Sequence, residues 1–447
     1  MTATLLDQLA AFVKVTASED IPAGVKEAAK VRIINLMAAV GLGMCSGVEN
    51  PLLNVTRIPS QPEATILFSG EPAPAPHAAA CNSYIATSSG TEDGSRFAGA
   101  HPSSGIIPSA LAAAETMGAS GADFLTAVIL GYEVHLRIGY ALYPYDLHRG
   151  FHSSAILAPL GSAAAVGRLL GIDATALRNA LSLACLSSAG LVCAFDAYPA
   201  KCYQIARAVK GGYEAALLAK DGMPGPELAL EDGFLKAYGN VEAIDLSGLG
   251  SRFLVTETYL KIHGGCRHIH PAIDAALSLR NEEGVRPDGV EAISVGITSA
   301  AHAMERENPQ TYTDARFNTP FLIAVALQEG QVSDEQITDA LLADQRLQAL
   351  CAKTQVAVDP ELDKNFPAER GAWVEIKLKD GRTVSRRLQN PVGEPENPLA
   401  PEVVGTMFKK ALTGILPPDR IDFLSGYLQD LEKQKSLMPF FDAIVNK

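Results

Sequence analysis

Four short segments of the chain combine histidine with charged or hydroxyl side chains, the residue types that bind anions and move protons. The first runs from Glu92 to Ser104 and places two carboxylates and a guanidinium between Ala-rich stretches. Its polar members are Glu92, Asp93, Arg96, His101, Ser103 and Ser104. A helix that begins at Pro102 would direct free N–H groups and the positive end of its dipole toward an anion. The alternative is a solvated loop with a capping serine.

The second and third segments also open predicted helices. His152 stands directly before Ser153 and Ser154, so it either faces an anion at a helix start or caps a surface turn. Lys201 lies in the first turn of a long helix, where a cation opposes the helix dipole. Such a violation of local preference sometimes marks a functional residue, although single surface lysines break this preference too.

The fourth segment, from Lys261 to Pro271, holds three histidines, an arginine, a lysine and a cysteine in a chain short of cations. His263, Cys266 and His268 could form a metal site, but no fourth ligand is evident. We therefore favour an anion pocket, with a purely structural role as the alternative.

The chemistry that these groups suit is proton transfer next to carboxylates. Lysine and arginine bind carboxylates and stabilise negative charge that develops on an enolate-like intermediate. Histidine titrates near neutral pH and can remove or deliver a proton at carbon.

Composition excludes several classes of protein. The 447 residues include 37 Lys or Arg and 50 Asp or Glu, which gives a formal net charge of −13. That balance argues against nucleic acid, which needs a basic face, and against a polybasic membrane anchor. With 47% hydrophobic and 19% charged residues, the chain can bury a core and is not disordered. Seven cysteines without a CxxC pair, and an N-terminus without a signal peptide, predict a cytoplasmic protein.

Motifs for cofactors and metals are missing. The chain has no GxxxxGK[ST] phosphate loop and no HExxH zinc motif. His148 and His152 are four residues apart, but Gly150 stands between them and no third metal ligand is near. We expect neither a cofactor nor a metal.

Hydrophobic periodicity predicts a mainly α protein with an α+β lid. Helices are expected over 5–13, 22–36, 102–118, 121–142, 153–171, 173–187 and 203–220, many with small residues that allow close packing. Glu133 and Arg137 form an ordinary i, i+4 pair on one of them. The predicted helical domain comprises residues 1–268 and 396–447.

The remaining residues, 269–395, form the predicted lid. Val290–Ile297 alternates like a strand, and two alternating runs between Trp373 and Leu388 meet at Asp380-Gly381, a hairpin signal. Residues 315–330 and 333–350 are predicted helices, the second capped by Ser333. Residues 401–447 return to helix.

Together these segments resemble the MmgE/PrpD family, which includes 2-methylcitrate dehydratases, cis-aconitate decarboxylases and iminodisuccinate epimerases. The resemblance covers nearly the whole chain, and the order and spacing of its short motifs make it specific. The motifs are Glu92–Ser104, Gly131-Tyr-Glu-Val134 with Arg137, Gly150-Phe-His152, Lys201 with Lys210-Gly211-Gly212, Cys266-Arg-His-Ile-His270, Lys379-Asp-Gly-Arg382 and Asn397-Pro398-Leu399.

This resemblance implies a homodimer of chains with a large helical domain and an α/β lid, and a site between the two domains. The positions that match the family's catalytic residues are Asp93, His101, His152, Lys201 and His270. The expected substrate ligands are Arg96, Ser103, Ser104, Arg267 and His268. His270 resembles the decarboxylase branch more than the 2-methylcitrate dehydratase branch.

Three positions depart from the family pattern. Phe97 stands where the decarboxylases have a small hydroxyl residue, Cys202 replaces the usual proline after the lysine, and Gln204 replaces a common histidine. These departures concern the substrate more than the type of reaction.

The leading hypothesis is a cofactor-independent lyase that dehydrates or decarboxylates a small di- or tricarboxylate related to citrate or aconitate. In this hypothesis Lys201 and Arg267 hold carboxylates while His101 and His152 exchange protons at carbon. His270 assists, and Asp93 sets the charge of its neighbours. An isomerase that inverts a carbon beside a carboxylate, such as an iminodisuccinate epimerase, is the second hypothesis. A non-catalytic metabolite-binding protein is the third.

Overall fold

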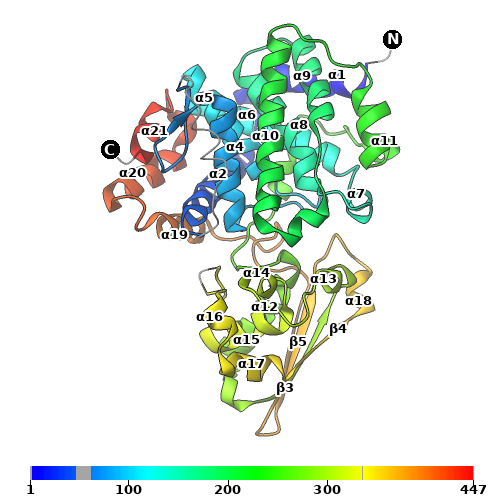
Figure 1. Cartoon of the computed structure of the whole chain (residues 1–447), viewed down its shortest axis with the longest axis vertical. Coiled ribbons are helices and arrows are strands. Elements are labelled where there is room, and N and C mark those ends of the chain that lie inside the picture. Colours follow the sequence, from blue (N-terminus) through cyan, green and yellow to red (C-terminus); the bar gives the residue numbers. More distant parts are fainter. Residues whose placement is uncertain (1–2, 47–61, 335, 446–447) are drawn as a thin grey trace. The chain divides into compact units, whose positions relative to one another are not determined.

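The chain divides into two compact units in the computed structural model, which describes residues 3–46, 62–334 and 336–445. Unit 1 comprises Met1–Thr258 and Ala400–Lys447, and unit 2 comprises Tyr259–Leu399 (Figure 1). Most elements of the described residues are helices, and the larger of the two sheets is a mixed sheet of four strands. These features confirm the predicted fold class.

Unit 1 is built almost entirely from helices. They are α1 (Leu5–Val15), α2 (Ala23–Met44), α4 (Ala75–Ser89), α5 (Pro102–Met117), α6 (Gly121–Gly139), α7 (Tyr145–His148), α8 (Ser153–Leu169), α9 (Ala174–Ser187), α10 (Tyr198–Lys220), α11 (Leu235–Tyr238), α19 (Pro401–Leu412), α20 (Pro418–Gln429) and α21 (Met438–Ile444). Two-residue strands β1 (Ala64–Thr65) and β2 (Pro72–Ala73) pair antiparallel. The predicted helices of this unit are therefore confirmed, and α10 begins five residues earlier than predicted.

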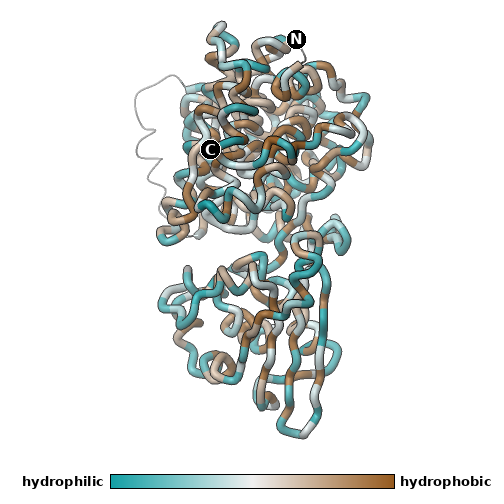
Figure 2. The backbone as a smooth tube through the Cα atoms, turned by 90° about the vertical axis from the view of Figure 1, so that its right-hand side faces the viewer, coloured by the Kyte–Doolittle hydropathy of each residue, from teal (hydrophilic) through white to brown (hydrophobic). Residues whose placement is uncertain are grey.

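Small residues bring the central helices of unit 1 close together. α8 packs against α5, α6 and α10, and hydrophobic stretches recur along the backbone of the chain (Figure 2). A Cβ on Gly212 of α10 would lie 2.3 Å from the carbonyl oxygen of Pro159 in α8. Only glycine permits that approach, so the small-residue pattern reflects helix packing.

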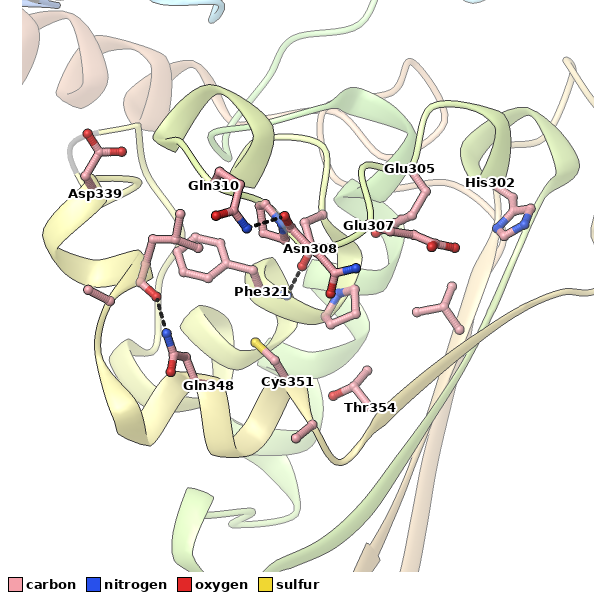
Figure 3. Close-up of a pocket in the computed structure, with 17 residues that line it drawn as sticks. His302, Glu305, Glu307, Asn308, Gln310, Phe321, Asp339, Gln348, Cys351 and Thr354 are labelled. Atoms are coloured by element: carbon pink, nitrogen blue, oxygen red, sulfur yellow. Dashed lines mark hydrogen bonds between the residues drawn. The ribbon is translucent and has the colours of Figure 1, made fainter.

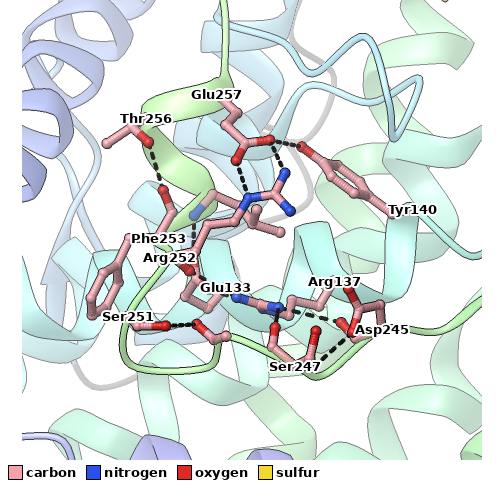
Figure 4. Close-up of polar contacts among 12 residues, drawn as sticks. Glu133, Arg137, Tyr140, Asp245, Ser247, Ser251, Arg252, Phe253, Thr256 and Glu257 are labelled. Carbon is pink, nitrogen blue, oxygen red and sulfur yellow. Dashed lines mark hydrogen bonds and ion pairs between the residues drawn. The ribbon is translucent and has the colours of Figure 1, made fainter. Parts of the chain in front are cut away.

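The Glu133–Arg137 pair does more than the ordinary i, i+4 pair that was predicted. Both side chains are buried, and their charged atoms lie 3.2 Å apart. The Arg137 guanidinium also donates to the carbonyl oxygens of Asp245, Ser247 and Arg252 (Figure 4). The pair therefore attaches residues 245–252 to helix α6.

Unit 2 is a four-stranded sheet covered by helices. Its strands, in the order β4-β3-β5-β6, are β3 (Val290–Ile297), β4 (Thr354–Val358), β5 (Ala372–Leu378) and β6 (Thr383–Leu388). β3 pairs parallel with β4 and antiparallel with β5, and β5 and β6 form the predicted hairpin. The helices are α12 (His270–Glu282), α13 (Ser299–Ala303), α14 (Tyr312–Ala315), α15 (Thr319–Glu329), α16 (Asp339–Leu342), α17 (Gln345–Cys351) and α18 (Pro360–Asp363).

One predicted helix is wrong. Residues 333–350 do not form a continuous helix, because Thr338 and Asp344 each cap a separate short helix, α16 and α17. The Ser333 hydroxyl donates to the Gln336 side chain and caps no helix. Helix α4 and strand β4 were not predicted. No helix of the described residues is long and apolar enough to cross a membrane.

Candidate functional site

Two histidines open two helices that pack against each other. His101 is the N-cap residue of α5, and His152 is the N-cap residue of α8. The backbone N–H of His101 donates to the Ser154 hydroxyl at 3.0 Å, which joins the two helix starts. Both starts have the positive end of a helix dipole, as the sequence predicted, and at α5 the Asp93 carboxylate already accepts the backbone N–H of Ser103. This part of unit 1 therefore favours a negatively charged ligand.

Asp93 holds the start of α5 in place. One carboxylate oxygen accepts the backbone N–H of Ser103 at 3.0 Å, and the other accepts the Tyr132 hydroxyl at 2.9 Å. Burial raises the pKa of the Asp93 carboxyl, and these hydrogen bonds act in the opposite direction. Both oxygens are thus engaged by the protein, so Asp93 positions the loop rather than presenting a free carboxylate.

The backbone of Asp93 also orients His101. The His101 Nδ1 lies 2.6 Å from the Asp93 carbonyl oxygen. A carbonyl oxygen only accepts, so His101 Nδ1 carries a proton, and proton exchange with a ligand would take place at Nε2.

Lys201 is paired with a residue that the sequence prediction passed over. Its Nζ lies 3.6 Å from Oε1 of Glu92, and both side chains are buried. The ammonium also lies 5.0 Å from the ring centre of Tyr198. Glu92 stands next to Asp93, and in sequence the two acids are indistinguishable. Only the fold shows that Glu92 is the carboxylate beside the lysine.

His152 completes this cluster. Its Nδ1 lies 2.7 Å from the Gln204 amide nitrogen, and its ring packs edge-on against Phe195. Burial holds the pKa of His152 well below its usual range, and the nearby charges of Lys201 and His101 act in the same direction. We name the group Glu92, His101, His152 and Lys201 the histidine–lysine cluster.

The predicted substrate ligands of unit 1 lie in the same loop and helix. Arg96 is buried, and its guanidinium carbon lies 4.9 Å from the centre of the Phe97 ring. Ser103 and Ser104 are buried in the first turn of α5, and the Ser104 hydroxyl donates to the carbonyl oxygen of His101 at 3.2 Å. Ser103 contributes its backbone to Asp93. Their roles as substrate ligands stay predictions.

Unit 2 contains the other predicted residues as a group of its own. The Arg267 guanidinium donates to Glu394 at 2.9 Å, to the Val392 carbonyl at 3.0 Å and to His270 Nδ1 at 3.1 Å. Burial lowers the pKa of His270 well below its usual range, with the positive charge of Arg267 as a second cause. Arg267 thus stabilises unit 2 itself, and its role as a carboxylate ligand stays a prediction.

His268 lies in the same turn of unit 2. It is packed beside the ring of Phe366. Burial lowers the pKa of His268 to about 3, and the charge of Arg370 adds to the effect. The ring is neutral at physiological pH, so it would act toward a ligand as a hydrogen-bonding group and not as a cation.

Two groups of histidines were the possible metal sites, one around His263 and one formed by His148 and His152. Nε2 of His263 lies 2.7 Å from the Asp274 carboxylate. His148 is exposed while His152 is buried. Among the residues that the structure describes, no group of three or more His, Cys, Asp or Glu side chains is arranged to hold a metal ion.

A separate cavity lies wholly within unit 2. It has a volume of about 760 Å³, and its lining includes His302, Glu305, Gln310, Phe321 and Cys351 (Figure 3). The Glu305 carboxylate accepts the N–H and hydroxyl of Thr319 at the start of α15. None of the predicted site residues lines this cavity.

The protein thus belongs to a class with two domains, a large helical domain that contains the histidine–lysine cluster and a smaller α+β domain. The model of the MmgE/PrpD N-terminal domain matches residues 7–247, and that of the MmgE/PrpD C-terminal domain matches residues 263–424. The chain therefore belongs to the MmgE/PrpD family, as its motifs predicted.

Curated relatives of the chain include enzymes of two kinds. The chain is 24% identical to the cis-aconitate decarboxylase of Aspergillus terreus, over 96% of this chain and 93% of the relative. It is 29% identical to the human cis-aconitate decarboxylase, over 74% of this chain and 72% of the relative. It is 24% identical to the mitochondrial 2-methylcitrate dehydratase of Yarrowia lipolytica, over 62% of this chain and 57% of the relative. Decarboxylases and dehydratases of this kind are lyases, which supports an enzyme of that class.

Proposed function

We propose that the chain is a lyase that removes CO₂ or water from a small polycarboxylate related to aconitate or citrate, without a cofactor. The observation that carries this proposal is the histidine–lysine cluster. Two helix starts, two imidazoles and one ammonium meet in a chain whose net charge is −13. The Lys201 ammonium and the positive ends of the two helix dipoles attract a substrate carboxylate, and the Glu92 carboxylate offsets part of that charge.

In the proposed reaction, Lys201 and the first turn of α8 bind substrate carboxylates. Loss of CO₂ leaves an electron pair on carbon, which an adjacent carboxylate spreads as an enolate-like charge. His101, protonated on both ring nitrogens at this stage, then delivers its Nε2 proton to that carbon and keeps the Nδ1 proton, which the Asp93 carbonyl oxygen accepts. Dehydration uses the same groups: neutral His101 removes the proton from carbon at Nε2, and hydroxide leaves as water with a proton from the Lys201 ammonium.

The participation of Arg267, His268 and His270 in this reaction stays a prediction from the family resemblance. So does the homodimer, which light scattering of the purified chain tests.

The reaction is tested by incubating the purified chain with cis-aconitate and with 2-methylcitrate, and following the products by mass spectrometry. We expect loss of CO₂ from the first or loss of water from the second. His101→Ala and Lys201→Ala should abolish turnover, and Lys236→Met, which removes an exposed lysine of unit 1, should not. A folded wild-type chain that converts neither compound contradicts the proposed substrate class. Deuterium uptake from solvent without loss of mass supports the isomerase instead.

A further inference from the structure

Gln204 of α10 extends a short backbone pairing beside His152. Phe151 and Leu191 face each other as an antiparallel bridge. The flanking bonds run from His152 N–H to Gly190 O at 3.2 Å and from Val192 N–H to Gly150 O at 2.9 Å. In this pattern the N–H and C=O groups of the central residue point away from the partner strand.

The side-chain amide of Gln204 takes up both of those backbone groups. Its Oε1 accepts the Leu191 N–H at 2.9 Å, and its Nε2 donates to the Leu191 carbonyl at 3.2 Å. A rotation of the amide by a half turn would set oxygen against oxygen and N–H against N–H. The backbone of Leu191 therefore determines which end of the amide faces His152.

The end that faces His152 is the NH₂ group, 2.7 Å from Nδ1. An amide nitrogen only donates, so Nδ1 of His152 must accept and carries no proton. A neutral imidazole then carries its proton on Nε2.

We propose that Gln204 is a positioning residue that holds His152 as the neutral tautomer with its proton on Nε2. Resting on the proposed function, this makes His152 a hydrogen-bond donor to the substrate and leaves the exchange of protons at carbon to His101. The two histidines are thus held in opposite tautomers, His101 by the Asp93 carbonyl oxygen and His152 by the Gln204 amide.

The charges around His152 act in the same direction. A second proton on Nδ1 would face the N–H of Gln204. Lys201 from α10 and His101 from the start of α5 both disfavour an imidazolium, and Glu92 alone favours it. Phe195 covers one edge of the ring and offers no charge. The ring therefore stays neutral across the physiological range.

The tautomer is read directly by ¹⁵N NMR of the chain labelled at histidine, with the His152 signals assigned by their loss in His152→Asn. In the wild type we expect Nε2 protonated, Nδ1 unprotonated, and no titration between about pH 6 and pH 8. Gln204→Glu places a carboxylate opposite Nδ1, so we expect Nδ1 to become protonated and His152 to titrate. Gln348→Glu, which adds the same charge on an exposed position of α17, should leave the His152 signals unchanged.

A wild-type spectrum with Nδ1 protonated would overturn the proposal, and so would a Gln204→Glu spectrum identical to wild type. This readout does not require turnover, so it stands apart from the test of the reaction. If cis-aconitate is converted, Gln204→Leu should lower kcat by at least about tenfold, as tautomer errors do in other enzymes, with a smaller change in KM. An unchanged kcat and pH profile in Gln204→Leu would show that the tautomer does not serve the reaction.

Discussion

Lys201 and Glu92 form a buried ion pair with 3.6 Å between Nζ and Oε1. Lys201 lies in the first turn of α10, where the helix dipole disfavours a cation. The neighbouring carboxylate offsets that repulsion. The pair explains how a lysine is stable at a helix start, where the helix dipole favours an acidic residue.

Lys201→Met should destabilise the chain, because it leaves the Glu92 carboxylate buried without its cation. Removal of one partner from a buried pair lowers the free energy of unfolding by about 3 kcal/mol or more. Glu92→Gln combined with Lys201→Met should lose less than Lys201→Met alone, since the double variant buries no charge. Urea unfolding of the four proteins measures this coupling. A double variant that loses the sum of the single losses would contradict the ion pair.

Tyr132→Phe should weaken the start of α5. The change removes one of the two hydrogen bonds on the Asp93 carboxylate, and a hydrogen bond to a charged group contributes about 1.5–3 kcal/mol. Asp93→Ala removes both hydrogen bonds and should lower the free energy of unfolding by more than Tyr132→Phe does. Thermal unfolding compares them. Equal stability of Tyr132→Phe and wild type would show that the hydroxyl contributes nothing to the loop.

The helix starts of the candidate site were predictable because their signals are local. The segments His101-Pro-Ser-Ser and His152-Ser-Ser predict helix starts, and helices begin at Pro102 and Ser153. What sequence could not decide is which of two adjacent acids meets the lysine, because that depends on the direction in which the loop turns. The loop turns Asp93 toward Ser103 and Tyr132, and Glu92 toward Lys201.

The predictions of the fold succeeded where the pattern was short-range and failed where distant pairing or competing helix caps decided the structure. The strand Val290–Ile297 and the β5–β6 hairpin were predicted because alternation and an Asp-Gly turn are short-range features. Strand β4 was missed because it forms through parallel pairing with β3, a partner more than fifty residues away. The helix over 333–350 was predicted from apolar spacing, and the competing caps at Thr338 and Asp344 interrupted it.

Arg137→Met should release residues 245–257 from helix α6. Its guanidinium satisfies three backbone carbonyl groups and the Glu133 carboxylate (Figure 4), and burial raises the pKa of Glu133 to about 7. Loss of the cation leaves these groups buried, which should lower the free energy of unfolding by about 3–5 kcal/mol.

The matched control for Arg137→Met is Lys236→Met, which breaks an exposed i, i+4 pair with Asp232 in the same unit and should change stability by less than about 0.5 kcal/mol. Limited proteolysis should cut Arg137→Met between residues 245 and 257 and leave the control intact. Equal protease resistance of the two variants would contradict this role of Arg137.

His135 should make the fold sensitive to acid. It is fully buried in α6, its two ring nitrogens have no hydrogen-bond partner among the described residues, and burial lowers its pKa to about 3. In the unfolded chain the same ring takes up a proton near pH 6.5. Between these values the unfolded state binds the extra proton, so the stability present above about pH 6.5 is lost as pH falls toward 3. One such group contributes a slope of about 1.4 kcal/mol per pH unit.

His135→Leu should remove this contribution without lowering stability at pH 7, since an apolar side chain of similar size replaces two buried polar atoms that lack partners. The free energy of unfolding measured from pH 7 to pH 4.5 should fall less steeply than in wild type. Part of the slope should remain, because buried His152 and His270 and half-buried His268 also have lowered pKa values. His148→Leu changes an exposed histidine and should retain the wild-type slope. If His135→Leu and wild type lose stability in parallel, the buried ring does not carry the acid sensitivity assigned to it.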